Sequence, residues 1–360
     1  MSVDMPDPHT LQIAPLLLDW YDRNARILPW RSPPGTPAPD PYRVWLSEIM
    51  LQQTTVAAVK SYFEAFTTRW PDVAALAAAD DADVMSAWAG LGYYARARNL
   101  LACARTVVSQ HGGKFPDDEA GLLKLPGVGR YTAAAVAAIA FGRRAAVMDA
   151  NVERVVARLF AVTEPLPEAK NRLYALTDTI TPDARAGDFA QAMMDLGATI
   201  CTPKAPKCLI CPLSALCAAQ AAGNAEALPA KAPKKAKPVR RGTIFWIERD
   251  GHVWLVRRPD KGLLGGMRAL PTGPWTPEAP GLTEAPLAAV GWTELSGHVR
   301  HVFTHFALEL SIVGTRIENS CVDQGAGEWW RIDAIGTAGL PTVFAKAAHR
   351  VLEEGEWLTG

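Results

Sequence analysis

The stretch Leu125–Thr132, with the sequence LPGVGRYT, carries two glycines immediately before an alanine-rich apolar run. Gly127 and Gly129 allow the backbone to turn tightly and to direct its N–H groups outward at the start of a helix expected over residues 131–141. Unpaired amides and the helix dipole both favour an anion, so this turn suits a phosphate without any charged side chain. A plain helix-turn-helix, in which the glycines allow close packing, explains the same residues equally well.

Around this turn, apolar residues recur at helical spacing, and glycine or proline separates the runs. The spacing predicts helices over residues 11–23, 42–66, 83–88, 99–111, 131–141 and 151–162. Beyond residue 242 the pattern changes to alternation with period two, which is typical of half-buried strands. Strands are therefore expected over residues 243–249 and 252–258, joined by the turn Asp250-Gly251, and over residues 306–312, followed by a closing helix over residues 341–357.

The 360 residues carry 37 basic and 37 acidic side chains, and 49% are hydrophobic, which is an ordinary globular composition. Residues 227–241 hold six basic side chains and no acidic one, interleaved with prolines, and this composition indicates an extended linker. The linker is either a solvated tether or a tether that also follows phosphates. The sequence thus predicts an all-α domain over residues 1–225, a linker over residues 226–241, and an α+β domain rich in antiparallel strands over residues 242–360.

No membrane or export signal is visible in the sequence. The longest apolar stretch, Ala133–Phe141, is far shorter than the about 20 residues that span a bilayer. The first residues, Met1 to Asp4, include neither a basic start nor an apolar core. We therefore expect a cytoplasmic protein that acts as a monomer and has no membrane partner.

Four cysteines lie close together with the spacing C-x6-C-x2-C-x5-C, namely Cys201, Cys208, Cys211 and Cys217. Disulfides are rare in cytosolic chains, and this spacing lets four thiolates meet at one metal centre. A tetrahedral zinc ion and a [4Fe-4S] cluster both take four thiolates, so the spacing does not separate them.

Two carboxylates are candidates for acid–base chemistry. Helical spacing places Glu48 on one face with Val44, Trp45 and Gln52, in largely apolar surroundings. Desolvation there would raise the pKa of Glu48 and keep a proton available near neutral pH, although a partly exposed glutamate is the commoner situation. Asp149 precedes the helix expected over residues 151–162, where aspartate is most often a cap and the amides stabilise its anion. If the two are neighbours, they form the acid and the anionic partner that cleave a glycosidic bond.

Together, the hairpin, Asp149 and the cysteine loop at residues 201–217 resemble the helix-hairpin-helix DNA glycosylase superfamily. Five further segments are similar to MutY-type adenine DNA glycosylases: LPWR (28–31), WLSEIMLQQT (45–54), GLGYYARARN (90–99), VMDANV (147–152) and QAMMDLGA (191–198). The resemblance covers nearly the whole chain and is strongest before the linker.

This resemblance implies a base-excision repair enzyme that hydrolyses the N-glycosidic bond of adenine opposite 8-oxoguanine or guanine in duplex DNA. It implies that Glu48 protonates adenine at N7 and that ionised Asp149, beside Tyr131 and Asn151, stabilises an oxocarbenium-like state. The other matched positions would surround the adenine or enter the helix near the lesion: Leu28, Trp30, Arg31, Gln191, Gln52, Gln53 and Tyr93. The hairpin glycines would hold DNA phosphate, and the four cysteines would hold a [4Fe-4S] cluster with a structural role.

Tyr131 carries a further implication. Relatives that cut the DNA strand have a lysine at this position, because an amine is needed for a Schiff base with the abasic sugar. We therefore expect a monofunctional enzyme. A bifunctional endonuclease III-like glycosylase for oxidised pyrimidines and a non-catalytic iron–sulfur DNA-binding protein are the alternatives; Tyr131 and the C-terminal domain weigh against the first, and the retention of Glu48 and Asp149 against the second.

Residues 242–360 resemble the C-terminal module of the adenine glycosylases, which is related to the Nudix fold. A Nudix hydrolase needs a cluster of glutamates on a helix to hold magnesium, yet residues 273–290 contain only Glu278 and Glu284. We therefore expect a domain that recognises 8-oxoguanine without hydrolysing nucleotides. Its recognition loop is expected to include Phe303, Thr304 and His305, with threonine where the family often has serine.

Overall fold

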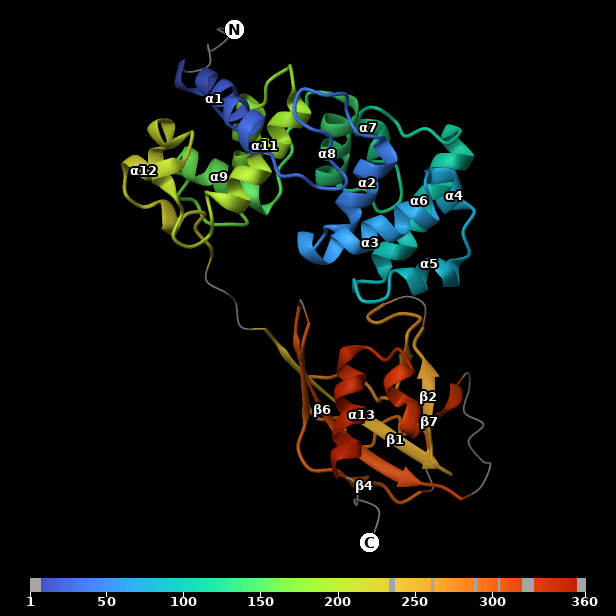
Figure 1. The fold of residues 1–360 in the computed structure, drawn as a ribbon. Coiled ribbons are helices and arrows are strands. Elements are labelled where there is room, and N and C mark those ends of the chain that lie inside the picture. The colour runs from blue at the N-terminus through green and yellow to red at the C-terminus, as the bar shows by residue number, and fades with distance from the viewer. Residues whose placement is uncertain are drawn as a thin grey trace. The chain divides into compact units, whose positions relative to one another are not determined.

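The computed structural model describes residues 8–232, 237–259, 262–287, 290–303, 305–318 and 327–354. The chain forms two compact units, residues 1–233 and residues 234–360. Figure 1 shows that the first unit is helical and that the second packs a sheet with helix α13. None of the helices in the described residues is both long and apolar enough to span a membrane.

The helices of the first unit are α1 (Pro8–Asn24), α2 (Pro41–Met50), α3 (Val56–Arg69), α4 (Val73–Ala77), α5 (Asp81–Ala87), α6 (Ala95–His111), α7 (Glu119–Leu122), α8 (Arg130–Phe141), α9 (Ala150–Leu159), α10 (Lys170–Ile180), α11 (Ala186–Thr199) and α12 (Ala218–Ala221). Short polar side chains start several of them; Asp40, for example, accepts a hydrogen bond from the Tyr42 amide at 2.8 Å. Left-handed glycines end others, as Gly112 does for α6 and Gly142 for α8.

Helix α8 forms the centre of this unit, and its residues 132–139 are all buried. Helices α2, α7 and α11 pack against it, because its alanines let neighbouring backbones approach closely. Two glycines of α11 complete this packing: a Cβ at Gly187 would lie 2.5 Å from the Ala138 carbonyl oxygen, and one at Gly197 would lie 2.7 Å from Asn151 Cβ. The start of α9 is thereby held against α11, which positions Asp149 at the cap of α9.

The prediction of one helix over residues 42–66 is wrong. Helix α2 ends at Met50, and α3 begins at Val56 after Thr55, whose side chain accepts a hydrogen bond from the Ala58 amide at 3.3 Å. Gln53, between the two helices, has a left-handed backbone with φ of 57°. Helical periodicity continues through the break, so the cap at Thr55 was the signal that sequence reasoning passed over.

The second unit contains strands β1 (Val239–Arg249), β2 (His252–Arg257), β3 (Arg268–Ala269), β4 (Thr293–Glu294), β5 (Val299–Val302), β6 (Ala307–Arg316) and β7 (Gly327–Arg331), and helix α13 (Thr342–Glu354). The sheet order is β3-β2-β1-β6-β4, with β5 also on β6 and β7 also on β2. The predicted hairpin of β1 and β2 is confirmed, and Leu308, Leu310 and Ile312 of β6 are buried as predicted. The fold class is therefore the expected one, although the pairing of β1 with β6 is parallel.

The first residues of the expected linker pack against the first unit instead of standing free of it. The carbonyl of Ala230 accepts a hydrogen bond from the Leu166 amide at 2.9 Å, and Leu228 is buried. Strand β1 begins at Val239, three residues before the expected boundary, because residues 239–241 already pair with residues 307–309.

Candidate active site

A cavity of about 650 Å³ lies between α2, α8, α9 and α11. Most of the residues predicted for the site line it, namely Leu28, Trp30, Arg31, Glu48, Gln52, Gln53, Tyr131, Asp149, Asn151 and Gln191. The structure therefore brings both candidate carboxylates to one hollow, although they are 101 positions apart in the chain. Tyr93 does not line this cavity.

Glu48 is buried within α2, with 6% of its surface exposed. Its carboxylate accepts one side-chain hydrogen bond, from the Tyr131 hydroxyl at 2.6 Å. Burial raises the pKa of Glu48 to about 7, an effect that the Tyr131 hydrogen bond and the Arg31 charge partly oppose and that Asp149 reinforces. The carboxyl of Glu48 can thus hold a proton near neutral pH. Burial also raises the pKa of Tyr131 far above its usual range, so Tyr131 remains a hydrogen-bond donor.

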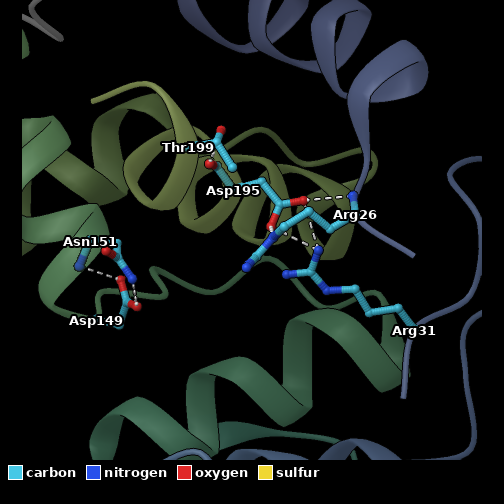
Figure 2. A network of polar contacts seen from close by, with 6 residues as sticks. All are labelled: Arg26, Arg31, Asp149, Asn151, Asp195 and Thr199. Atoms are coloured by element: carbon cyan, nitrogen blue, oxygen red, sulfur yellow. Dashed lines mark hydrogen bonds and ion pairs between the residues drawn. The ribbon is translucent and has the colours of Figure 1, made fainter. Parts of the chain in front are cut away.

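Asp149 lies at the N-cap of α9, where three donors meet its carboxylate, and Figure 2 shows the two that come from Asn151. Oδ1 accepts hydrogen bonds from the amides of Asn151 and Val152, at 2.8 and 2.7 Å, and Oδ2 accepts one from Asn151 Nδ2 at 2.9 Å. The side-chain oxygen Oδ1 of Asn151 accepts in turn from Arg154 Nη2, at 2.9 Å. These contacts fix the orientation of Asp149 at the positive end of a helix dipole.

Arg31 and Arg26 converge on a fully buried aspartate, Asp195 of α11 (Figure 2). Arg31 Nη1 contacts both carboxylate oxygens, at 2.9 and 2.8 Å, and Arg26 Nε contacts Oδ1 at 2.6 Å. The side chain of Arg31 is 8% exposed, so this ion pair holds it at the cavity wall. Removing one partner of such a pair leaves an uncompensated buried charge.

Gln53 and Tyr93 are exposed and lie on two neighbouring loops. Both have left-handed backbones, with φ of 57° and 50°, which is unusual for residues with side chains. Trp30 and Gln191, by contrast, are buried, and the Trp30 ring meets the edge of Phe63 with centroids 5.3 Å apart.

The predicted tight turn is present at residues 126–129, directly before α8. Gly127 has φ of 72°, and a Cβ there would lie 2.7 Å from Asn99 Cβ, so only glycine fits. Gly129 is the N-cap of α8 and offers no side-chain acceptor to the first amides of the helix. These amides can therefore donate hydrogen bonds to an external anion.

The four cysteines of the predicted metal site carry free thiols and line a second cavity. Arg158, which is 1% exposed, donates to Cys201 Sγ at 3.3 Å and to backbone carbonyls, including that of Thr202 at 2.7 Å. Arg158 thus places a positive charge beside a sulfur that would be anionic once iron or zinc is bound. Burial raises the pKa of the Cys211 thiol to about 11, so a metal centre would have to drive its deprotonation. In the described part of the chain, no three His, Cys, Asp or Glu side chains are grouped as ligands of one metal ion.

The expected recognition loop of the second unit is described in part, because Thr304 lies outside the described residues. His305 is exposed, and Phe303 stacks on Trp275 with ring centroids 6.0 Å apart. Lys237 Nζ donates to the Phe303 carbonyl at 2.7 Å.

Sequence reasoning missed several residues of the site. Asp195 lies within the quoted segment QAMMDLGA, four residues after Gln191, and this spacing on one helix face was a usable signal. Arg26, Lys170 and Tyr174 line the cavity without any pattern that marks them in the sequence.

Comparison with known proteins agrees with this architecture. A family model for HhH-GPD superfamily base excision DNA repair proteins matches residues 46–178, and a NUDIX domain model matches residues 243–350. The chain is 35% identical to the adenine DNA glycosylase of Homo sapiens, over 92% of this chain and 72% of the human protein. It is 43% identical to that of Mycolicibacterium smegmatis, over 57% of this chain and 69% of that protein.

A solved structure of a thermostable thymine-DNA glycosylase aligns with 59% of this chain and 97% of its own, with a TM-score of 0.54 and 33% identity. The part of the chain that aligns with this structure therefore has a glycosylase fold. The similarity to the human protein extends over 92% of the chain, which also contains the matched NUDIX domain. Two matched domain models and similarity along nearly the whole chain establish that the protein belongs to the adenine DNA glycosylases of base-excision repair.

Proposed function

We propose that this adenine glycosylase acts through Glu48 as the acid and Asp149 as the anionic partner. The observation that carries the proposal is the presence of both carboxylates in one cavity of about 650 Å³. Pockets for small organic ligands usually measure about 300–1,000 Å³, so an extruded nucleoside can enter. The adenine must leave the base stack first, at a cost of a few kcal/mol, because its glycosidic bond is inaccessible within the duplex.

Glu48 can supply a proton because its pKa is about 7. Protonation of adenine at N7 makes the base a better leaving group, and the C1′–N9 bond breaks through an oxocarbenium-like state. Asp149 stabilises the positive charge on the sugar, through space or by transient covalent capture. Water then adds its hydroxyl to C1′, and its remaining proton returns to the Glu48 carboxylate.

The other cavity residues hold the reacting groups. Tyr131 orients Glu48 through its hydrogen bond, and Asn151 orients Asp149. Arg31, held by Asp195, offers donors to the base at the wall of the cavity. The remaining proposed adenine contacts are Leu28, Trp30, Gln52 and Gln191.

The proposed DNA substrate carries adenine opposite 8-oxoguanine or guanine. Gln53 and Tyr93 are exposed on adjacent loops, where they can enter the space that the adenine leaves. The amides of Gly127 and Gly129 are suited to a backbone phosphate. Thr304 and His305 are proposed to meet 8-oxoguanine.

Cys201, Cys208, Cys211 and Cys217 are proposed to hold a [4Fe-4S] cluster. Their shared cavity and the buried Arg158 suit an anionic thiolate-bound centre, and their spacing matches the family pattern. The cluster would order the loop that carries Lys204 and Lys207, two positively charged residues that can meet DNA phosphate. An absorption band at about 410 nm is expected for the iron–sulfur protein, whereas a zinc protein would be colourless.

We further propose that base removal is not coupled to strand cleavage, because the Tyr131 phenol cannot form a Schiff base. Borohydride should therefore trap little protein–DNA adduct with the wild type. The variant Tyr131→Lys is the matched positive control, since it places an amine in the same cavity. Stoichiometric trapping with the wild type at the rate of base release would contradict the proposal.

The function is tested by measuring adenine release in single-turnover reactions with duplexes that carry adenine opposite 8-oxoguanine, guanine or thymine. We expect release that is fastest opposite 8-oxoguanine, slower opposite guanine and slowest opposite thymine. Equal rates on all three duplexes would contradict the lesion preference, and no release from any of them would contradict the function.

A further inference from the structure

Arg96, in the first turn of α6, joins two loops through a single guanidinium group. Its Nη1 contacts the carbonyl oxygens of Ile49, Met50 and Gln52, at 3.0, 3.1 and 2.5 Å. Its Nη2 contacts Thr54 Oγ1 at 3.2 Å and the Leu91 carbonyl at 3.0 Å. The first loop follows the helix that carries Glu48, and the second contains Tyr93.

The contacts of Arg96 lie next to the two residues with left-handed backbones, Gln53 and Tyr93. Gln53 lies between two of its acceptors in the first loop, and Tyr93 follows the Leu91–Gly92 segment that it contacts in the second. Both residues are left-handed, a conformation that is unfavourable for a residue with a side chain and persists only when its surroundings enforce it. The Arg96 guanidinium also lies 5.5 Å from the centroid of the Tyr93 ring.

We propose that Arg96 is a positioning residue that holds Gln53 and Tyr93 ready to enter the DNA helix together. This inference rests on the proposed function, in which these two side chains fill the space left by the adenine. Arg96 itself touches neither the carboxylates nor the cavity that contains them, so its effect must pass through the loops.

The charge and shape of the guanidinium explain why arginine is needed. Arg96 is bound by carbonyl and hydroxyl oxygens, and its Nη1 contacts lie at the C-terminal end of α2, where the helix dipole favours a cation. A planar fork of donors can reach acceptors on both loops at once. A lysine ammonium keeps the charge but is a single point, so it can serve one loop at a time.

The matched control is Arg105, on the same helix. It donates to the carbonyls of Ala77, the last residue of α4, and of Ala79, and it also pairs with the Asp81 carboxylate; these groups lie away from the two left-handed residues. Arg96→Lys and Arg105→Lys therefore remove the same kind of contact from two different places. We expect Arg96→Lys to slow adenine release from duplexes with adenine opposite 8-oxoguanine by about 10- to 100-fold, and Arg105→Lys to slow it less than about threefold.

Two further readouts separate positioning from a loss of folded protein. With 2-aminopurine in place of the target adenine, the wild type should raise its fluorescence on binding, and Arg96→Lys should raise it much less. In the Tyr93→Ala background, Arg96→Lys should slow adenine release clearly less than it does in the wild type, because one of the two side chains that Arg96 positions is gone. Should Arg96→Lys not fold, Thr54→Val removes one acceptor of Arg96, together with the hydrogen bond from the Thr54 hydroxyl to the Gln52 carbonyl, and should slow release about threefold.

The outcomes distinguish this inference from the proposed function. If the wild type neither releases adenine nor raises the 2-aminopurine signal, the function fails and the inference fails with it. If the wild type does both, while the two lysine variants behave alike or Arg96→Lys costs as much without Tyr93 as with it, the positioning role alone is overturned.

Discussion

The two walls of the cavity present the same chemical group in opposite settings. On the α2 wall, Glu48 is buried within a helix and accepts one side-chain hydrogen bond, from Tyr131. On the α9 wall, Asp149 precedes the helix and accepts hydrogen bonds from two amides and one side-chain amide. Burial with a single donor favours the protonated form of the Glu48 carboxyl group, whereas several donors at a helix N-terminus hold the Asp149 carboxylate in place.

This difference shows how one fold assigns two roles to two carboxylates. An acid must hold a proton that it can give away, and an electrostatic partner must stay negative while positive charge develops on the sugar. The burial of α2 against α8 supplies the first condition, and the amides of Asn151 and Val152 at the start of α9 hold the Asp149 carboxylate where the second requires it. Removal of the Glu48 carboxyl group should therefore impair proton donation to the base, and removal of the Asp149 charge should impair stabilisation of the positive sugar.

The largest effect is expected for Glu48→Gln. Glutamine keeps the shape of the side chain but carries no acidic proton, so adenine release should fall about 10³-fold. Glu153→Gln is the control, since Glu153 lines the same cavity, and it should cost less than about tenfold. Single-turnover release from an adenine:8-oxoguanine duplex measures both. An unchanged rate in Glu48→Gln would make the assignment of the acid wrong.

Asp149→Asn should have the next largest effect. Asparagine still caps a helix well, so the melting temperature should change little, but the negative charge is lost. Removal of one electrostatic contact to a transition state typically slows a reaction about 10²-fold, and we expect that loss in adenine release. A variant that melts like the wild type and reacts at the same rate would exclude an electrostatic role for Asp149.

The smallest effect concerns stability. Because the pKa of Glu48 is raised to about 7 from 4.5, the folded protein binds this proton more tightly than the unfolded chain does. Wild-type stability relative to Glu48→Gln should therefore be highest below about pH 4.5, fall as the pH rises, and level off above about pH 7, with a total change of about 3 kcal/mol. Denaturant unfolding of both proteins at several pH values measures this difference. A constant difference across that range would contradict the raised pKa.

Features that depend on neighbouring residues could be predicted from the sequence, whereas contacts between distant segments could not. The hairpin glycines, the Asp149 cap and the cysteine spacing are short-range signals, and the strand alternation of residues 306–312 predicted the buried face of β6. The parallel pairing of β1 with β6 joins residues almost 70 positions apart, so no local pattern predicts it. The ion pairs of Asp195 with Arg26 and Arg31 depend in the same way on tertiary packing of α11.

The burial of Glu48 illustrates the limit most clearly. Helical spacing placed it on an apolar face but did not show what covers that face, and a partly exposed glutamate was the commoner expectation. The partner that orients it, Tyr131, comes from the first turn of α8, 83 positions further along the chain. Conversely, the break between α2 and α3 was missed because the apolar periodicity of the two helices is continuous.

The most direct test of the account is the pH dependence of single-turnover adenine release by the wild type and by Tyr131→Phe. The rate for the wild type should fall as the pH rises through about 7, since Glu48 loses its proton there. The Tyr131 hydrogen bond lowers the pKa of Glu48, so its removal should move this fall to higher pH. A rate that stays flat between about pH 5 and 9, or a fall that moves to lower pH in Tyr131→Phe, would contradict the role of Glu48 as the protonated acid.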